Sequence, residues 1–403
     1  MKRHSRLSIT RGAIALTLGT TLLAPAHADV VVDWNEKANQ WIADSRLGTP
    51  PAIRALALAQ TAVYEAVRAA GTRASVDAAV AAANHAVLHP LLPEQREPIA
   101  AAYQTALAGI APGAHKDAGI AAGEQAAAAV LRQRADDTGA IAAAAAAANY
   151  RPHTSAGAYV PTAMPALPHW AQRKPWLMSS AAQFRAAAPP ALASAHWARE
   201  YNEVKELGAR ASTRRSAEQT EIARFWEYSL PSIYYGVLRS VALQPGRDSA
   251  RNARLYAAAA QAMDDAMIGV FEAKYHYQFW RPLSAIRNGD IDGNDGTARD
   301  AAWTSLIEAP LHPEYPSAHA ILAASVGAVL KAETGGSPTP QLATSSPTAK
   351  GATRRWNSVD AFVQEVADAR VYAGIHYRVA TQAGMTMGQQ IGELAAAKFM
   401  PVP

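Results

Sequence analysis

The sequence predicts an all-α fold, built as two packed helical bundles with long irregular connections. Apolar residues recur at helical spacing over most of the chain, and these stretches are rich in alanine. Residues 151–200 lose that periodicity and are rich in proline and tryptophan instead. A long segment of this kind indicates an irregular connection between an N-terminal and a C-terminal helical part.

Residues 1–28 have the features of a cleavable secretory signal. Four basic residues come first, an apolar run follows, and Ala26-His27-Ala28 supplies a small-x-small cleavage pattern. Because no two arginines are adjacent, the general secretion route is favoured over the twin-arginine route. The apolar run is short for a membrane span, and no later segment is long and apolar enough. We therefore expect an exported protein, periplasmic or extracellular, without membrane insertion.

Residues 29–150 form the predicted N-terminal helical part. Thr49-Pro50-Pro51 begins a helix, because proline is favoured in the first helical turn. Residues 95–150 predict Ala-rich helices that are interrupted at 109–113 and near Gly139. The run 140–148, almost all alanine, is predicted to be a packing helix.

Residues 201–403 form the predicted C-terminal helical part. Residues 335–355 contain much Gly, Ser, Thr and Pro, which predicts a mobile surface loop. Residues 287–300 predict a solvated turn, because their Asp and Asn residues lack the spacing and the final glutamate of a helix–loop–helix calcium site. Helical patterns occupy 190–210, 216–245, 250–280, 317–334 and 358–398.

Charge and cysteine content exclude several classes of protein. The net charge is +5, and residues 1–28 hold four basic and no acidic residues, so the remainder carries about +1, five minus four. This near neutrality argues against nucleic acid as a partner. The chain has no cysteine, which excludes disulfides, thiolate metal sites and cysteine catalysis. Nothing in the sequence indicates an oligomeric state.

Three motifs in the last third of the chain carry the chemistry: KYHYQFWRP at 274–282, YPSAHA at 315–320 and ARVYAGIHYR at 369–378. Among their residues, three cations, one serine and two histidines are the candidates for a binding site. Guanidinium groups bind the edges of a tetrahedral oxyanion, an ammonium adds a point charge, and a hydroxyl and backbone amides complete the shell. The candidate residues are Lys274, Arg281, Arg370, Ser317, His319 and His376.

Local structure is expected to bring these residues together. Lys274 and Arg281 are two helical turns apart and can converge on one point, with the helix ending before Pro282. Pro316 is the expected first residue of the next helix, which places Ser317 in a first turn whose free amides bind anions. Gly374 predicts a bend between Arg370 and His376.

Each residue alone has an ordinary explanation. A single cation on an Ala-rich helix is usually solvated, a single histidine is usually a surface or hydrogen-bonded core residue, and a serine after proline usually starts a helix. The three motifs in this order are much harder to explain in that way.

The order K-x6-RP, P-S-x-H and R-x5-H resembles the superfamily of vanadium-dependent haloperoxidases and type 2 phosphatidic acid phosphatases. The longer segments KYHYQFWRPLSAIR and LHPEYPSAHA are more similar to the haloperoxidases. The resemblance extends from about residue 29 to the end and is strongest from about residue 215. It implies an α-helical fold of two bundles and vanadate as cofactor, with phosphate able to occupy the same site.

The resemblance also implies a role for each motif residue. His376 would be the axial ligand to vanadium, or the phosphorylated nucleophile of a phosphatase, and His319 the acid–base residue. His312 stands where bromide-using members have histidine and chloride-using members have phenylalanine, which favours bromide or iodide; alternatively, it caps the loop before Pro313. The equatorial oxygens would bind Lys274, Arg281, Ser317, Arg370 and the backbone amide of Ala318.

Two positions depart from the family pattern. Ala318 replaces the usual glycine and adds a methyl group beside the anion-binding amide. Ala380 replaces an aspartate that would be expected to orient His376. Glu227 is a candidate substitute acid. On this reasoning Ala380→Asp is predicted to raise vanadate affinity or turnover, unless another acid already has that role or Ala380 lies in a dry helix contact.

Three functions follow from these observations. The first is a secreted haloperoxidase that uses hydrogen peroxide to oxidise halide, with a small organic substrate as acceptor. The second is an acid phosphatase in which His376 is the nucleophile and His319 protonates the leaving group. The third is a non-catalytic member that binds vanadate or phosphate.

Overall fold

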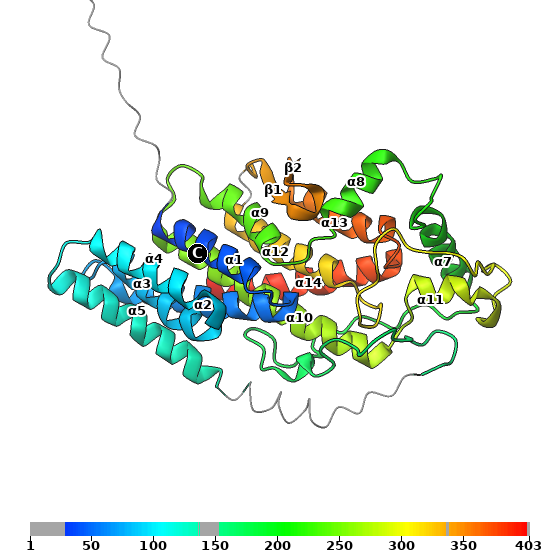
Figure 1. Ribbon diagram of the computed structural model, residues 1–403, viewed down its shortest axis with the longest axis horizontal. Helices are drawn as coiled ribbons and strands as arrows, with labels where there is room; N and C mark the ends of the chain where they lie inside the picture. Colours follow the sequence, from blue (N-terminus) through cyan, green and yellow to red (C-terminus); the bar gives the residue numbers. More distant parts are fainter. Residues whose placement is uncertain (1–28, 136, 138–152, 336–337, 401–403) are drawn as a thin grey trace, which may run out of the picture.

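The protein is an elongated, mostly α-helical molecule (Figure 1). Residues 29–135, 137, 153–335 and 338–400 are described by a computed structural model. The predicted signal at 1–28 and the predicted packing helix at 140–148 lie outside these residues. Over the part of the chain that is described, no helix is both long and apolar enough to cross a membrane.

The N-terminal helices gather at one end of the molecule, at the left of Figure 1. They begin after Asp29, whose side chain caps the first helix by accepting the backbone N–H of Val31 at 2.8 Å. They are α1 (Val30–Asp44), α2 (Thr49–Ala70), α3 (Val76–Leu91), α4 (Arg96–Ala108) and α5 (Ala114–Gln133).

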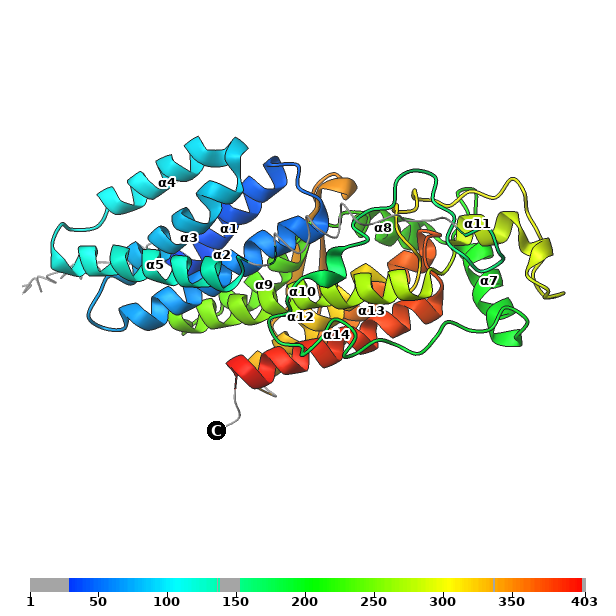
Figure 2. The same cartoon turned by 90° about the horizontal axis from the view of Figure 1, so that it is seen from below.

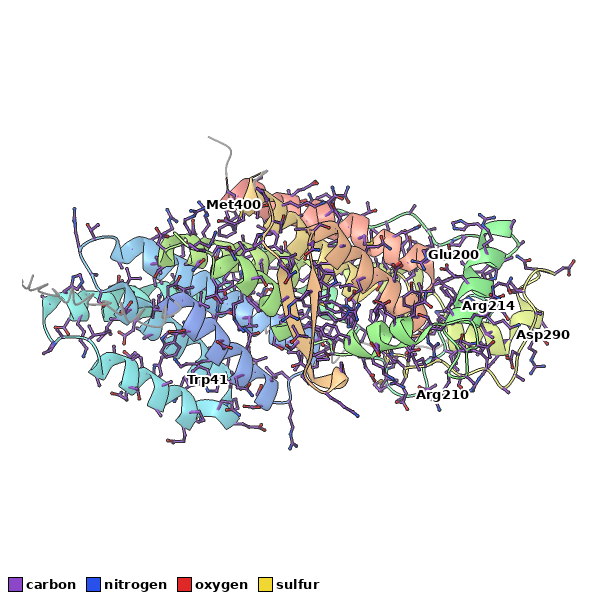
Figure 3. The ribbon with its side chains drawn as sticks, turned by 90° about the horizontal axis from the view of Figure 1, so that it is seen from above. Trp41, Glu200, Arg210, Arg214, Asp290 and Met400 are labelled. Carbon is purple, nitrogen blue, oxygen red and sulfur yellow. The ribbon has the colours of Figure 1, made fainter. Side chains whose placement is uncertain are left out.

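The C-terminal helices occupy the centre and the other end. Figure 2 shows α10, α12 and α14 running side by side along the long axis. Arg214 and Asp290 lie at the end opposite to Trp41 of α1 (Figure 3). The elements are α7 (Ala195–Leu207), α8 (Ala217–Phe225), α9 (Ser232–Ala242), α10 (Ser249–Tyr277), α11 (Pro282–Arg287), α12 (Ala318–Thr334), α13 (Val359–Tyr372) and α14 (Arg378–Phe399).

One apolar core joins the two helical parts. Its buried residues come from α1, α2 and α3 as well as from α9, α10, α12, α13 and α14. Helix α10 lies at the centre of this core and is buried along most of its length, so both parts pack against it. A second, aromatic cluster lies around Trp197, Trp280 and Tyr377. This cluster supports the segments that precede α11 and α14.

The Pro- and Trp-rich connection from residue 153 to α7 is irregular, as predicted, apart from a short 3-10 helix at Trp170–Gln172. Two buried aspartates of α10 fix it to the core. Asp265 accepts three consecutive backbone N–H groups, those of Trp176, Leu177 and Met178, at 2.7–2.9 Å. Asp264 accepts the Trp176 indole N–H at 2.6 Å. This segment has no regular secondary structure, so its backbone N–H groups donate hydrogen bonds to these side chains instead.

Three sequence predictions about elements need correction. The pattern at 216–245 is two helices, α8 and α9, which Trp226–Pro231 separates. The pattern at 358–398 is likewise two helices, α13 and α14. Residues 335–355 were predicted to be a mobile loop but contain an antiparallel hairpin, β1 (Leu342–Ser346) and β2 (Ala352–Trp356). Buried Leu342 and Trp356 hold its open end in the core, which composition alone could not reveal.

Close contact between α12 and α14 depends on glycines at every fourth position of α14. A Cβ at Gly384, Gly388 or Gly392 would lie 2.2–2.6 Å from a backbone oxygen of the α12 segment. The oxygen nearest Gly384 belongs to Ser317, at the start of α12. The position of the serine therefore depends on this helix contact.

We predict that Gly388→Ala lowers the free energy of unfolding by about 1–3 kcal/mol, because the new methyl group would lie 2.2 Å from the carbonyl oxygen of Ile321. Chemical denaturation monitored by circular dichroism measures the change. Gln390→Ala, on the exposed face of the same helix, is the control and should have little effect. Equal stability of both variants would mean that α12 and α14 can separate at no cost.

Candidate active site

Lys274 is a fully buried ammonium in the last turn of α10. Its Nζ donates hydrogen bonds to the backbone carbonyls of Pro313 and Glu314, each at 2.8 Å. An ammonium has three donors, so one remains for a ligand. The lysine therefore fixes the segment that leads into α12 while keeping a donor available.

Arg281 connects that segment to the one before α14. Its Nε donates to the carbonyl of His312 at 3.0 Å, and its Nη1 donates to the carbonyl of Ile375 at 2.7 Å. The same Nη1 is 3.3 Å from Nε2 of His376, and Nη2 is 3.0 Å from Nδ1 of His312. Nη2 also donates to the carbonyl of Pro313 at 3.3 Å. All five guanidinium donors thus have an acceptor.

Lys274 and Arg281 converge, but not for the predicted reason. Helix α10 ends at Tyr277, and Gln278 adopts a left-handed conformation that caps it. Arg281 then has extended backbone geometry as the N-cap residue of α11. The two cations meet because the chain turns between them, and not because they share a helical face.

Ser317 is the N-cap residue of α12, and its hydroxyl accepts the N–H of Ala320 at 3.5 Å. Pro316 precedes the cap, which corrects the prediction that it begins the helix. Ala318 is the first helical residue, so its amide belongs to the turn whose N–H groups have no helical partner. Its backbone is helical rather than left-handed, so alanine fits here without the strain that would demand glycine.

Arg370 lies in the last turn of α13 and is 2% exposed. Its Nη1 donates to the carbonyl of Trp226, and its Nε has no partner. The predicted bend follows at Gly374, whose φ is 76°. A Cβ there would also lie 2.3 Å from the carbonyl oxygen of Gly208. The bend redirects the chain before His376, which lies between α13 and α14.

His376 is 2% exposed, and its Nδ1 is 2.8 Å from Oε1 of Glu314. Burial lowers the pKa of His376 well below its usual value, and the nearby cations Arg281 and Lys274 lower it further. The imidazole is therefore neutral and has one nitrogen lone pair available. That lone pair is what a ligand atom or a nucleophilic attack requires.

His319 lies in the first turn of α12, and the carbonyl of the same residue accepts the hydroxyl of Tyr234 at 3.5 Å. Its ring is hydrogen-bonded to the backbone of Tyr228, and its Nε2 is buried without a partner. Burial and Arg370 lower the pKa of His319 well below its usual value. A neutral ring with an unpartnered nitrogen can accept or return a proton at a ligand.

Sequence reasoning missed the contribution of Glu314. This glutamate is fully buried in the motif LHPEYPSAHA, and Oε1 accepts the N–H of Tyr377 at 2.9 Å in addition to contacting His376. An acidic residue three positions before Ser317 was the available signal. The candidate substitute acid, Glu227, forms an ion pair with Arg224 at 3.2 Å and also raises the pKa of Arg370 through its charge, but His376 is contacted by Glu314.

The pocket holds more positive than negative charge. Burial lowers the pKa of Lys274 well below its usual value and lowers those of Arg281 and Arg370 to about 10. Burial raises the pKa of Glu314 to about 8, although Arg281 and Lys274 act in the opposite direction. Three buried cations with one carboxylate are electrostatically unfavourable unless an anion joins them. The site is therefore built to bind an anion.

The donor set distinguishes between an oxyanion and a bare cation. Within the residues described, no three His, Asp or Glu side chains are grouped so as to hold a metal ion. The groups available are N–H and O–H donors with the lone pairs of the neutral His376 and His319 rings. This arrangement suits a tetrahedral or trigonal oxyanion that accepts hydrogen bonds all round.

Comparisons with known proteins agree with this geometry. The family model described as the VCPO second helical-bundle domain matches residues 254–402. Vanadium chloroperoxidase of Curvularia inaequalis is 31% identical over 168 residues, which cover 34% of this chain and 28% of that protein. Over its C-terminal helical part, this chain is therefore similar to vanadium-dependent haloperoxidases. The match thus spans little more than a quarter of that relative's length.

Solved structures of the haloperoxidase family share the fold over nearly the whole chain. The structure described as the first bacterial vanadium-dependent iodoperoxidase has a TM-score of 0.75 and 23% identity, and the match covers 91% of this chain and 96% of that one. A holo-type bacterial vanadium-dependent chloroperoxidase has a TM-score of 0.71 and 17% identity, with 87% and 92% covered. The predicted all-α fold is confirmed.

The residues present fit the vanadate of this family. Arg370 Nε and His319 Nε2 are buried polar atoms without protein partners, and both belong to predicted ligand-contacting residues. His376 Nε2 faces a guanidinium that an oxyanion could replace as its neighbour. A vanadate here would be held by Lys274 and Arg281 and by the groups at the start of α12.

The family aspartate could not act from position 380 in this chain. His376 precedes α14, which begins at Arg378, so the two positions are not one turn apart on a helix. Ala380 is fully buried in the aromatic cluster, and its carbonyl accepts the N–H of Ser317 at 3.0 Å. The Nδ1 of His376 is already occupied by Glu314. These contacts reverse the expectation that Ala380→Asp improves the site.

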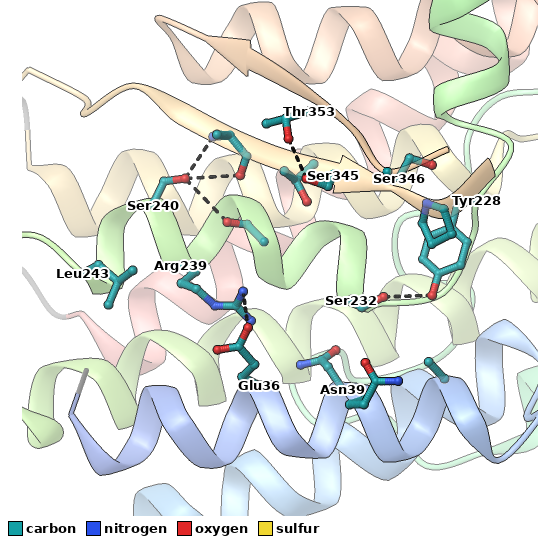
Figure 4. A pocket seen from close by; sticks show the side chains of 17 residues that line it. Glu36, Asn39, Tyr228, Ser232, Arg239, Ser240, Leu243, Ser345, Ser346 and Thr353 are labelled. Carbon is teal, nitrogen blue, oxygen red and sulfur yellow. Dashed lines mark hydrogen bonds and ion pairs between the residues drawn. The ribbon is translucent and has the colours of Figure 1, made fainter. Parts of the chain in front are cut away.

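A hydroxyl-lined cavity of about 730 Å³ lies nearby, between α1, α9 and the hairpin (Figure 4). Tyr228 is among the residues that line it, and the Ser232 hydroxyl donates to the Tyr228 hydroxyl at 3.1 Å. The backbone of Tyr228 also forms a hydrogen bond with His319, so this residue touches both the cavity and the histidine.

We predict that orthovanadate or phosphate raises the melting temperature of the protein, because an anion relieves the repulsion among the buried cations. At about 100 times the Kd the stabilisation is about 2.7 kcal/mol. Differential scanning fluorimetry measures the shift at matched ionic strength. Arg370→Gln should remove most of it, whereas Arg214→Gln, at an exposed position, should not. A shift that both variants retain would place the anion elsewhere.

We further predict that Ala380→Asp lowers the free energy of unfolding by about 2 kcal/mol or more, since it buries a carboxyl group among aromatic rings. Vanadate affinity should not rise. Thermal unfolding and isothermal titration calorimetry measure the two quantities. Gln382→Asp, on the exposed side of the same helix, is the control. Tighter vanadate binding by Ala380→Asp would restore the expectation from the family pattern.

Proposed function

We propose that this protein is a vanadate-dependent haloperoxidase that oxidises halide with hydrogen peroxide. The observation that carries the proposal is the neutral imidazole of His376, buried beside Arg281 with Nε2 directed at the guanidinium. One nitrogen lone pair within a shell of cationic donors is the arrangement that an oxyanion bound through its central atom needs.

The chain's own residues would have distinct tasks. Lys274, Arg281 and Arg370 neutralise the charge of the oxyanion, and the amide of Ala318 adds a donor at the start of α12. His319, with its unpartnered Nε2, takes a proton from hydrogen peroxide or returns one. Bound vanadate supplies the oxygen-transfer chemistry.

Bromide or iodide is the proposed halide. His312 is half-buried against Phe271, with ring centroids 5.3 Å apart, and its Nδ1 is held by Arg281. Chloride-using members of the family have phenylalanine at the position of His312. The polar ring of His312 therefore favours bromide and iodide, which are oxidised more easily than chloride. We also propose export to the periplasm or the exterior, supported by the pattern of residues 1–28.

An acid phosphatase remains the second candidate, and the contact between Glu314 and His376 favours it more than the sequence did. A carboxylate behind Nδ1 stabilises the imidazolium character that develops when Nε2 attacks phosphorus. The absent aspartate at position 380 therefore does not by itself remove a nucleophile. A non-catalytic oxyanion-binding protein is the third candidate.

The deciding experiment compares apo-protein with vanadate-loaded protein in two assays. If the proposal is right, bromination of monochlorodimedone with hydrogen peroxide appears only after vanadate is added. Hydrolysis of p-nitrophenyl phosphate that vanadate inhibits would support the phosphatase. Vanadate binding with neither activity would support the non-catalytic candidate and overturn the proposal. Chloride, bromide and iodide in parallel would identify the preferred halide.

Replacing His376 and replacing His319 should have different effects. His376→Ala is expected to lose vanadate retention by more than tenfold, because it removes the imidazole that Glu314 holds. His319→Ala is expected to lose turnover about 10²–10⁴-fold with a smaller effect on vanadate binding. Calorimetry and the bromination assay separate the two effects. Wild-type vanadate affinity in His376→Ala would contradict its role as the ligand.

A further inference from the structure

Glu314 is held more rigidly than an ordinary buried glutamate. Its backbone N–H donates to the carbonyl of Phe279 at 2.9 Å, and its own carbonyl accepts the ammonium of Lys274 at 2.8 Å. Its Oε1 accepts the backbone N–H of Tyr377 at 2.9 Å. Both main-chain groups and one carboxyl oxygen are therefore fixed before the histidine is considered.

The contacts of His376 determine its tautomer. Arg281 can only donate, because a guanidinium has no acceptor, so the nitrogen that lies 3.3 Å from Nη1 must be the one with a lone pair. That nitrogen is Nε2. The proton of the neutral ring is consequently on Nδ1, where Oε1 of Glu314 lies 2.8 Å away.

This assignment holds whether or not Glu314 carries a proton. Oε1 already accepts the N–H of Tyr377, whereas Oε2 is buried without a partner. A proton on the carboxyl group would therefore sit on Oε2 and leave Oε1 as an acceptor. The geometry alone fixes the direction of the hydrogen bond from His376.

We infer that Glu314 is the positioning residue of His376, and that it takes the place of the carboxylate missing at position 380. By accepting the Nδ1–H, it keeps Nε2 unprotonated and sets the plane of the ring so that Nε2 faces the oxyanion pocket. The consequence for ligand affinity rests on the proposed function; the tautomer does not. Removing an outer hydrogen-bond partner of a ligating histidine typically costs about 10–100-fold in affinity.

Glu314 lies on a different segment of the chain from position 380, where the family pattern places the acid. Glu314 is on the segment that leads into α12, which Lys274 and Arg281 hold through backbone carbonyls. The cations that would bind the oxyanion therefore also locate the acid that orients its histidine. A disturbance of this segment should affect both anion binding and the histidine ring.

The test uses the protein labelled with ¹⁵N-histidine and compares it with four variants. Glu314→Gln keeps an acceptor oxygen without the charge, and Glu314→Leu removes the acceptor. Glu200→Gln is the matched control, because Glu200 is also buried and accepts a backbone N–H, that of Val379 at 2.8 Å, but does not contact His376. The His376→Gln spectrum assigns the resonances.

If Glu314 positions His376, the Nδ1–H tautomer should be found in wild type and in Glu200→Gln, and it should predominate in Glu314→Gln. In Glu314→Leu the tautomer should become mixed, and orthovanadate affinity by calorimetry should fall about 10–100-fold. Thermal unfolding establishes that each variant is folded. If Glu314→Leu does not fold, the wild-type spectrum and the comparison of Glu314→Gln with Glu200→Gln still test whether Glu314 sets the tautomer of His376.

Two outcomes overturn the inference: an Nε2–H tautomer in wild type, or wild-type tautomer and vanadate affinity in Glu314→Leu. The spectra are recorded without vanadate, so they are independent of activity. If no protein binds vanadate but the Nδ1–H tautomer depends on Glu314, the proposed function fails and the positioning role stands. If vanadate binds and supports bromination equally in all variants, the positioning role fails instead.

Discussion

Three buried cations are the constraint around which this molecule is organised. Lys274, Arg281 and Arg370 are each at most 2% exposed. Glu314 attracts Lys274 and Arg281 electrostatically, whereas Glu227 attracts Arg370. Unpaired buried charge costs several kcal/mol unless hydrogen bonds compensate. Backbone carbonyls of the segments before α12 and α14 supply that compensation for Lys274 and Arg281, so these two cations hold the walls of their own pocket together.

Such a pocket needs rigid support from elements distant in sequence. Glycines on α14 let it approach α12 so closely that Ser317 can donate its backbone N–H to Ala380. Asp264 and Asp265 tie the irregular connection to the middle of α10, which carries Lys274 in its last turn. Aromatic rings around Tyr377 fill the space behind the histidine. Preorganised donors of this kind lose little entropy when an anion binds.

Sequence reasoning identified the residues that meet in the pocket better than the backbone geometry that brings them together. A helix start close to Ser317 and the bend at Gly374 could be predicted because each depends on local residue types. The turn at Gln278, the hairpin at 342–356 and the role of Glu314 could not, since each depends on contacts between distant segments. The expectation for position 380 was wrong because it assumed that one helix contains both His376 and Ala380. In the structure α14 begins only at Arg378, after the histidine.

Oxyanion binding and histidine orientation are coupled through one donor. All five N–H groups of Arg281 have protein acceptors, and the longest of the contacts to the His376 ring is the Nη1–Nε2 distance of 3.3 Å. A bound oxyanion could accept the N–H of Arg281 Nη1 and also bind Nε2 of His376. Arg281 and His376 would then each exchange their mutual contact for a contact with the ligand. The exchange leaves the carbonyl bonds of Arg281 intact and keeps Glu314 in place. A ligand that lacks either an acceptor oxygen or an atom for Nε2 to bind would break the contact between Arg281 and His376 without replacing it, so such a ligand should bind less tightly than an oxyanion.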